Sequence, residues 1–300
     1  MAIHQAYDAA GHGHKDKIVL IPPGSTEHVA QSLKQAGIID SPLLFQAATA
    51  WTHNDGPLRA GEYLFPAQAS LHQVLNILRK GAEVQHQATV PEGLTSRQIA
   101  HIIEALPATT GHIKPPAEGS VLPQTYDYVY GTSRSAILTR MQAAMHAALA
   151  QLWPARAPDL PVQTPEQAVI LASIVQQETP LASDMPMVAA VYENRLRIGM
   201  KLQADPTVIF AASDGAQSDG LNISRADLAL DSPYNTYMHK GLPPGPICAP
   251  GLAALKAVLH PADSDALYFV AMKNGTHRSV FSNSLQEHLE NIKRYLDPGR

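Results

Sequence analysis

The sequence has little of several features that mark common classes of protein. It contains one cysteine, Cys248, in 300 residues, which excludes an internal disulfide and a thiolate metal cluster. It has no run of about 18 apolar residues, so we expect no transmembrane helix in it. Residues 1–15 also lack the apolar core of a signal peptide. We therefore expect either a cytosolic protein or one whose targeting segment was removed before residue 1.

The sequence also lacks a cluster of basic residues and the known motifs for phosphate binding, metal binding and nucleophilic catalysis. The net charge is −4, and the 22 Lys and Arg residues are scattered, which argues against nucleic acid as a partner. The sequence has no Gly-rich phosphate loop, no HExxH pair and no GxSxG elbow. His12 and His14 could bind a metal, but a flexible polar leader over residues 1–15 is the preferred interpretation. We expect no metal and no cofactor.

What the sequence does have is enough apolar residues for a sizeable core, 45% of the chain, and an expected two domains. Three segments in the first hundred residues share a strand, a Pro-containing turn, a Ser or Thr at the position of a helix N-cap, and an amphipathic helix. We interpret them as βα pieces of a small mixed domain. They read IVLIPPGSTEHVAQSL from Ile18, YLFPAQASLHQVLNIL from Tyr63 and ATVPEGLTSRQIAHII from Ala88.

A stretch rich in Pro, Gly and polar residues follows, and it ends at a strong helix signal. Residues 104–163 are interpreted as a connecting region with one helix over about 136–153. Thr164 and Gln167 then form a predicted capping box, with Pro at the first helical position. The helix should end near Glu178, because Pro180 disfavours helical geometry at the residue before it.

Glu178 is placed where an acid is unexpected. Leu171, Ile174 and Val175 lie on the same predicted helix face, so Glu178 terminates an apolar stripe. Desolvation and the negative end of the helix dipole would both raise its pKa, and a carboxylic acid protonated near neutral pH can act as a general acid. An ordinary solvated glutamate at a frayed helix end is the alternative.

The residues after Glu178 favour a polar cleft. A second helix is predicted over 186–198, capped by Asp184 and closed by Gly199. Polar residues around its end, between 194 and 205, need partners if they are buried. The run SPYNTYMHKGLPPGPICAPG, residues 232–251, is predicted to be an ordered loop, and its aromatic, amide and hydroxyl groups suit sugar rings or peptides. Cys248 in this loop is interpreted as a packing residue.

Several of these segments together resemble a known family. ILASIVQQET, NRLRIGMKLQADPTVIF, SPYNTYMHKGLPPGPICAPG and LYFVA are similar, in order, to the motifs of the YceG-like family, the MltG-type endolytic murein transglycosylases. IPPGST, RAGEYLFP and VPEGLTSRQIA resemble the LysM-like region of that family, and EGSVLPQTYDY resembles its link to the catalytic domain. The resemblance covers residues 16 to about 295.

The resemblance implies a fold and a domain order. We expect an α+β protein with small LysM-like βα modules followed by a mixed α/β catalytic domain. The expected ranges are a leader at 1–15, a LysM-like region at 16–103, a connecting region at 104–163 and a catalytic transglycosylase domain at 164–297.

The resemblance also implies a reaction. The family cleaves the glycosidic bond after MurNAc in nascent peptidoglycan without water and leaves a 1,6-anhydro end. Its acid corresponds to Glu178, whereas a second acid that many relatives have two residues earlier is Gln176 here. One acid suffices if it first protonates the leaving oxygen and then, as a carboxylate, takes a proton from the C6 hydroxyl of the sugar. Asp205 is the other nearby acid.

The remaining expectations concern substrate contacts, histidines and location. Relatives have a His two residues before the Phe of the last motif, where this chain has Ser279, and His277 is displaced. For His277 and His288, structural and catalytic roles both stay open. The family has an N-terminal membrane helix, so we expect a trimmed ectodomain at the periplasmic face of the bacterial inner membrane. The expected substrate-binding residues are Asn194, Arg195, Gln203, Asp205, Thr207, Tyr234, Asn235, Thr236, Tyr237, Pro243 and Pro244.

The expected partners are peptidoglycan glycan strands and cell-wall synthesis proteins, and the expected role is to set strand length during wall assembly. Two alternatives stay open. One is a muramidase that uses water, with Asp205 as the second carboxylate. The other is a non-catalytic scaffold that binds peptidoglycan through its LysM-like modules.

Overall fold

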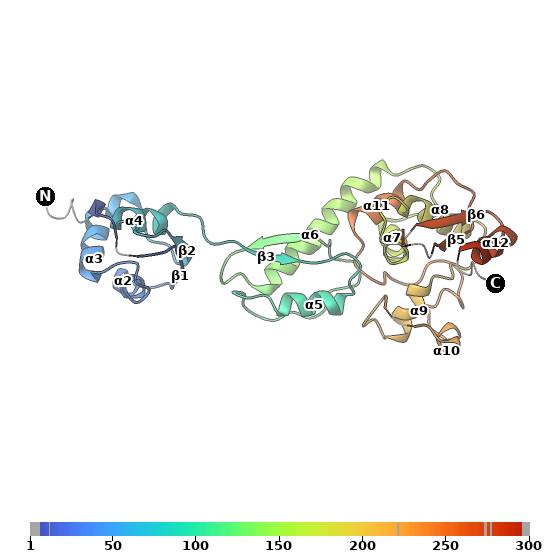
Figure 1. Cartoon of the computed structure of the whole chain (residues 1–300), viewed down its shortest axis with the longest axis horizontal. Helices are drawn as coiled ribbons and strands as arrows, with labels where there is room; N and C mark the ends of the chain where they lie inside the picture. The colour runs from blue at the N-terminus through green and yellow to red at the C-terminus, as the bar shows by residue number, and fades with distance from the viewer. Residues whose placement is uncertain (1–6, 12, 221, 273–274, 277, 296–300) are drawn as a thin grey trace. The chain divides into compact units, whose positions relative to one another are not determined.

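The computed structural model describes residues 7–11, 13–220, 222–272, 275–276 and 278–295, and its elements are labelled in Figure 1. The chain forms two compact units. The first, the N-terminal unit, comprises residues 1–88 with 107–110 and 127–133, and the second, the C-terminal unit, comprises 89–106, 111–126 and 134–300. Both contain helices and two-stranded sheets, so the mixture of helices and small sheets in the expected α+β fold is confirmed.

The N-terminal unit is built on an antiparallel pair of strands with helices packed against it. Strands β1 and β2 pair from Lys17 opposite Phe65 to Ile21 opposite Gly61. Helix caps form where the sequence predicts them: Ser25 and Ser70 accept a backbone N–H at the starts of α2 and α4, respectively. The elements in order are β1 (Lys17–Ile21), α2 (Thr26–Gln35), α3 (Pro42–Trp51), a 3₁₀ turn (His53–Asp55), β2 (Gly61–Phe65) and α4 (Leu71–Lys80).

The third predicted strand–helix segment is also confirmed. Strand β3 (His86–Thr89) pairs with β4 (Thr125–Tyr128) in a second two-stranded sheet. Helix α5 (Ser96–Glu104) starts at Thr95, which forms a full capping box with Gln98. All three segments therefore fold as strand, turn and capped helix.

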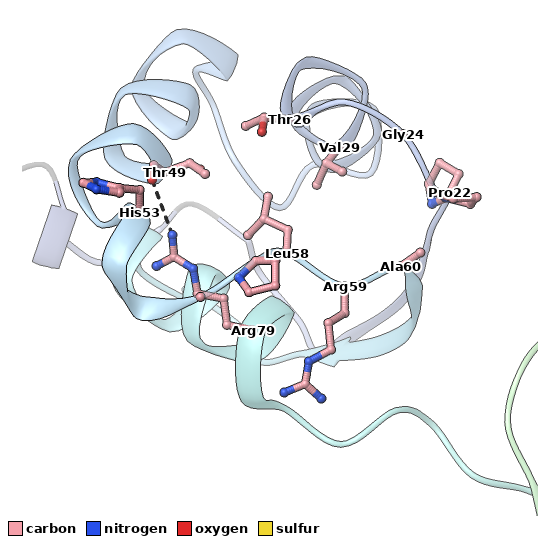
Figure 2. Close-up of a pocket in the computed structure, with 13 residues that line it drawn as sticks. Pro22, Gly24, Thr26, Val29, Thr49, His53, Leu58, Arg59, Ala60 and Arg79 are labelled. Carbon is pink, nitrogen blue, oxygen red and sulfur yellow. Dashed lines mark hydrogen bonds between the residues drawn. The ribbon is translucent and has the colours of Figure 1, made fainter.

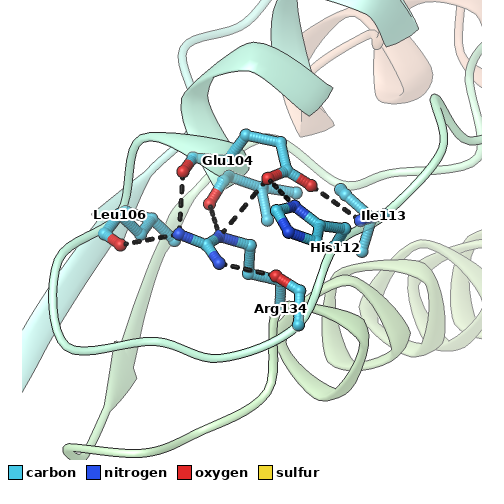
Figure 3. A network of polar contacts seen from close by, with 7 residues as sticks. Glu104, Leu106, His112, Ile113 and Arg134 are labelled. Atoms are coloured by element: carbon cyan, nitrogen blue, oxygen red, sulfur yellow. Dashed lines mark hydrogen bonds and ion pairs between the residues drawn. The ribbon is translucent and has the colours of Figure 1, made fainter.

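Part of the connecting region is ordered by one arginine (Figure 3). Arg134 donates to the carbonyl oxygens of Ile103 at 3.1 Å and Glu104 at 2.9 Å, so it satisfies the free acceptors at the end of α5. It also donates to Gly111 O at 2.6 Å. The Glu104 carboxylate accepts the Ile113 N–H at 2.7 Å, which ties the loop back to the same helix. The polar composition of this stretch supplies the bonds that order it.

The C-terminal unit is mostly helical. The predicted helix over 136–153 is α6 (Arg134–Leu152), and the one predicted over 186–198 is α8 (Met185–Arg197). The predicted loop over 232–251 contains no helix or strand. The other elements are a 3₁₀ turn (Trp153–Ala155), α7 (Pro165–Glu178), α9 (Asp205–Ala212), α10 (Arg225–Leu228), α11 (Leu252–Leu259), β5 (Tyr268–Ala271), β6 (Ser279–Ser282) and α12 (Leu285–Tyr295).

Helix α7 lies at the centre of this unit. It packs against α8, α9 and α11. Leu171, Ile174 and Val175 are fully buried, as the predicted stripe requires. The opposite positions Ala172 and Ser173 are buried too, so the apolar face is wider than a single stripe. Small residues on that side let neighbouring segments approach closely, and α7 can then hold its last residue in a fixed place.

Candidate active site

The end of α7 fixes the position of Glu178. Thr164 accepts the N–H of Gln167 at 3.2 Å, which is half of the predicted capping box. The other half is different from the prediction, because the Gln167 side chain accepts the N–H of Gln163 at 2.7 Å. Glu178 is the last helical residue, and Thr179 is extended at φ −147° and ψ 133°, as Pro180 requires.

Polar side chains on the other faces of α7 anchor it to neighbouring loops. Gln176, the position where the resemblance places a second acid, accepts the N–H of Gly251 at 2.9 Å. Gln177 donates to the carbonyl oxygen of Gly93 at 2.6 Å. Ser173 accepts the N–H of Ile247 at 3.0 Å. These bonds make the helix a rigid support, and they give Gln176 a structural function that needs no acid.

Glu178 opens into a pocket of about 350 Å³. The pocket lies within the C-terminal unit, and its walls come from α7, α8, α12, β5, the start of α9 and the loop at Tyr237. Five of its residues are among the twelve site residues expected from the sequence. The lining residues are Glu178, Tyr192, Arg195, Gln203, Asp205, Tyr237, Tyr268, Phe269, Leu285 and His288.

Glu178 has the electrostatic properties of a general acid. Burial is the main cause that raises the pKa of its carboxyl from 4.5 to about 7, and the negative charge of Asp205 adds to it. Two groups act in the opposite direction: Tyr192 donates its hydroxyl to Glu178 Oε1 at 2.6 Å, and Arg195 is a nearby cation. Burial and the contact with Glu178 raise the pKa of Tyr192 well above 10, so Tyr192 stays a donor at neutral pH.

A second tyrosine–carboxylate pair lies in the same pocket. Tyr237 donates its hydroxyl to Asp205 Oδ1 at 2.6 Å. Burial and the contact with Asp205 raise the pKa of Tyr237 well above 10. Asp205 itself is exposed, unlike Glu178. The two carboxyl groups therefore have different surroundings, an arrangement that assigns them different roles.

Arg195 is a buried residue in the pocket lining. Its side chain is buried, and it donates to the backbone carbonyls of Leu267, at 2.7 Å, and Leu202. Its guanidinium lies 5.4 Å from the ring centroid of Tyr268 and 5.9 Å from that of Tyr192. Arg195 thus holds α8 to β5 and orients the two aromatic side chains that flank it.

The other predicted substrate-binding residues lie outside the lining of this pocket. Thr207 and Thr236 are buried and share a hydrogen bond of 2.9 Å between their hydroxyls. Asn235 is fully buried and donates to three carbonyl oxygens in the segment 227–230. Asn194 donates to Ser264 O and Ala266 O at 2.7 and 3.0 Å. Thr207, Asn235 and Thr236 support the segments that carry Asp205 and Tyr237, and Asn194 supports the loop before β5. The assignment of these residues to substrate binding stays a prediction.

Three further predicted contacts are also elsewhere. Tyr234 lines a different pocket, of about 290 Å³, together with Arg97 and Glu118. Pro243 is buried and Pro244 is exposed, and neither is in the Glu178 pocket. These assignments, too, stay predictions.

Five lining residues were not among the predicted site residues. Tyr192 lies one turn before Arg195 on α8, so the helical spacing could have placed it on the same face. Tyr268 and Phe269 belong to the motif LYFVA, whose aromatic pair was not assigned a role. Leu285 and His288 carry no local signal, because only the packing of α12 against β5 brings them to the pocket.

Asp184 departs from its predicted role. It stands at the start of α8, but its side chain makes no capping bond there. Instead, Asp184 Oδ2 accepts the N–H of Ser279 at 3.1 Å, which anchors the start of β6. Gly199 closes the helix as predicted, with φ +64°. Cys248 is buried and free, in agreement with a packing role.

The structure also bears on metals and membranes. His12 and His277 lie outside the described residues. Among the residues that the structure describes, no group of three or more His, Cys, Asp or Glu side chains is arranged to hold a metal ion. No helix within the described ranges is both long enough and apolar enough to span a bilayer.

Comparisons with known proteins agree with the expected family. The model of the YceG-like family matches residues 19–294. An endolytic murein transglycosylase of Bacillus subtilis is 30% identical, over 92% of this chain and 84% of the relative. One of Streptococcus pneumoniae is 27% identical over 92% of this chain but only 58% of the relative. The crystal structure of a yceG-like protein from Listeria monocytogenes has a TM-score of 0.57 and 29% identity, with 93% of this chain and 99% of that chain covered.

Proposed function

The chain belongs to the YceG-like family, and from this membership and the pocket around Glu178 we propose that it is an endolytic murein transglycosylase. The bond cleaved is the β-1,4 linkage between MurNAc and GlcNAc within uncrosslinked glycan strands. The product is a strand with a 1,6-anhydroMurNAc end. The names of the relatives support the activity, and the surroundings of Glu178 support the mechanism.

The observation that carries the proposal is a carboxyl group of pKa about 7 that opens into a pocket. At neutral pH the protonated and the ionised forms of Glu178 are then both populated. Tyr192 occupies Oε1 as a donor, so the proton of the acid resides on Oε2. In the first step Glu178 gives this proton to the bridging oxygen, the C1–O bond breaks, and GlcNAc leaves with a hydroxyl.

The second step uses the same group in its other form. The Glu178 carboxylate removes the proton of the MurNAc C6 hydroxyl, and O6 attacks C1 to close the anhydro ring. The proton that Glu178 lost is thereby restored, and no water is consumed. Intramolecular attack makes a second carboxylate nucleophile unnecessary. Tyr192 stabilises the intermediate carboxylate through its hydroxyl.

Asp205 and Tyr237 have a supporting role in this scheme. The exposed Asp205 carboxylate stabilises the positive charge that develops at C1 in the oxocarbenium-like transition state. The presence of both acids in one pocket is also the observation that favours the competing hydrolase, in which Asp205 would activate water. The two reactions differ in the mass of the product by one water.

The N-terminal unit has the strand, helix, helix, strand order of β1, α2, α3 and β2. We assign it, with the segment to residue 103, as a LysM-like glycan-binding region. Figure 2 shows a pocket of about 600 Å³ between the loop after β1, at Pro22 and Gly24, and the loop before β2, at Leu58 and Ala60. Its apolar walls and scattered donors suit a sugar chain.

Binding at this pocket has a direct test. Ala60→Trp would fill the pocket and weaken binding of glycan strands by about tenfold, which corresponds to the loss of a few contacts. Ala67→Trp is the matched control, because Ala67 is exposed outside this pocket. Equal affinity of the two variants would contradict the assignment.

Location and role follow from the substrate. We propose that the protein acts outside the cytoplasmic membrane, at the periplasmic face of the inner membrane, where nascent glycan strands are made. Cleavage within strands would set their length during wall assembly, together with cell-wall synthesis proteins.

The test of the proposed function is mass spectrometry of uncrosslinked glycan strands after incubation with the wild-type protein or with Glu178→Gln. We expect anhydro-ended fragments from the wild type and none from the variant. Reducing-end fragments would establish the hydrolase instead. Strands that are bound but left intact by folded wild-type protein would establish the non-catalytic scaffold.

A further inference from the structure

His288 lines the Glu178 pocket and has a ring nitrogen with an unusual environment. Its Nδ1 atom is buried and has no hydrogen-bond partner within the described part of the chain. A buried polar atom without a partner costs about 1–3 kcal/mol. An apolar ring at the same position would avoid this cost. We therefore expect the imidazole to have a polar function in the pocket.

The position of the imidazole is fixed by stacking. Its ring lies on the ring of Tyr268, with 5.2 Å between centroids and 23° between planes. The guanidinium of Arg195 also lies near Tyr268, 5.4 Å from its centroid. Packing alone would be served equally well by a phenyl ring, which has no nitrogen to leave unpaired. Stacking therefore explains the orientation of the ring but not why the residue is a histidine. The other ring nitrogen, Nε2, is the atom that can explain the choice.

The protonation state of His288 follows from its neighbours. Burial and the positive charge of Arg195 both lower the pKa of the imidazole below 6.5. The ring is then neutral at pH 7, and one of its two nitrogens carries hydrogen. A buried N–H without a partner is rarer in proteins than a buried acceptor without one. The tautomer that leaves no buried N–H without a partner has a bare Nδ1 and its hydrogen on Nε2.

We propose that His288 is a substrate-positioning residue whose Nε2–H donates a hydrogen bond to an oxygen of the sugar that lies against Tyr268 in the Glu178 pocket. Sugar hydroxyls and acetamido carbonyls are acceptors of this kind. The pocket would then have two groups of residues with different functions. Glu178 and Tyr192 transfer the proton, and His288 and Tyr268 hold the sugar ring in position. This inference rests on the proposed function for the identity of the sugar.

Three substitutions separate the hydrogen bond from the stacking. His288→Gln keeps an amide donor near the position of Nε2, His288→Asn moves the donor to the position of Nδ1, and His288→Phe keeps the stacked ring without a donor. We expect kcat/KM on uncrosslinked strands within about threefold of wild type for Gln, and about five- to tenfold lower for Asn and Phe, mainly through KM. Thermal melting of each variant verifies that it is folded.

Strand binding measures the same contact without cleavage. Fluorescein-labelled strands are titrated into Glu178→Gln protein that carries each His288 substitution, with the same order of affinities expected. If His288→Gln is as weak as His288→Phe, or if all variants equal the parent, the inference is overturned. Wild-type protein that cuts no strands would overturn the proposed function alone, since the binding series still decides the role of His288.

Nitrogen NMR tests the tautomer directly. In uniformly ¹⁵N-labelled protein, the His288 resonances are assigned by their loss in His288→Gln. Shifts of a neutral ring with hydrogen on Nε2 are expected at pH 7. A hydrogen on Nδ1, or a charged ring, would overturn the inference.

Discussion

The C-terminal unit contains two glutamates with nearly the same acidity in very different places. The pKa values of Glu178, at the end of α7, and Glu193, within α8, are both raised to about 7, and burial is the main cause in both. Glu178 opens into a pocket and accepts a hydroxyl from Tyr192. Glu193 is fully buried, its Oε1 has no partner among the described residues, and its Oε2 lies 3.3 Å from Arg197.

The difference shows what a raised pKa can and cannot indicate. Desolvation raises the pKa of any carboxyl that folding removes from water, whether or not a substrate can reach it. Access to a pocket and a donor that stabilises the carboxylate are the additional features of a general acid. Glu178 has both, whereas Glu193 has a donor in Arg197 but does not line the pocket, and Glu193 is therefore the natural control for Glu178.

The largest expected effect is on activity. Glu178→Gln removes the proton that is transferred, so we expect the rate of anhydro-product formation to fall by about 10²–10⁴. Glu193→Gln makes the same chemical change outside the pocket, and its rate should stay within about twofold of wild type. Initial rates on uncrosslinked strands at pH 6.5 measure both. A comparable loss in the two variants would mean that Glu178 acts through stability.

The second effect is on stability, where the two glutamates should behave alike. Both have a pKa raised above the unfolded value of 4.5, so their contribution is fully present below pH 4.5 and is lost as pH rises through about 7. Gln substitution removes this dependence. At pH 8 we expect each variant to gain on the order of 2 kcal/mol over wild type, because the wild-type carboxyls must then ionise where burial disfavours the charged form.

Calorimetric melting temperatures at pH 5 and pH 8 measure this gain. Near pH 5 the carboxyls are protonated in the folded wild type, and the advantage of both variants should be small. A gain that is equal at the two pH values would show that it arises from packing and that the ionisation of these glutamates contributes nothing.

The third effect is on the pH dependence of activity, and it concerns Tyr192, which donates a hydrogen bond to Glu178 and not to Glu193. The hydroxyl of Tyr192 lowers the pKa of Glu178, so Tyr192→Phe should raise that pKa. The alkaline fall in activity, expected near pH 7 in wild type, should then move to higher pH. The rate at pH 6.5 should fall about tenfold, since the carboxylate intermediate loses a charge-assisted hydrogen bond. A profile of kcat against pH measures both.

Tyr126→Phe is the matched control for this substitution. Tyr126 is buried in the same unit and donates its hydroxyl to Leu122 O at 2.6 Å, away from the Glu178 pocket. It should leave the pH profile unchanged. A shift of the alkaline limb in Tyr126→Phe as well would trace the effect to general loosening of the unit.

The contrast between the two glutamates also marks the limits of the sequence. Capping and periodicity are local, so the helix that ends at Glu178 and the caps at Ser25, Ser70 and Thr95 could be predicted from short stretches. Capping and periodicity do not predict that Glu193 is buried, because its burial depends on helices that are distant in sequence.

The candidate site was predictable in part for the same reason. Glu178, Arg195, Gln203, Asp205 and Tyr237 come from polar residues in or near family motifs, and the fold brings them to one pocket. Tyr268 and His288 reach it through the packing of α12 on β5, which no local pattern encodes. Polar residues were also predicted at the site that bond only within the protein, namely Thr207, Asn235 and Thr236. Composition cannot distinguish a polar residue that binds substrate from one that binds another part of the protein.

The smallest expected effect concerns Asp205, an acidic neighbour that Glu178 has and Glu193 lacks. Its negative charge raises the pKa of Glu178, so Asp205→Asn should lower that pKa and move the alkaline limb to lower pH. The anhydro product should persist, because no step requires Asp205 to bind water. Asp214→Asn is the control, as an exposed aspartate outside this pocket. Loss of all product in Asp205→Asn would instead make Asp205 indispensable to the reaction, as in the hydrolase in which it activates water.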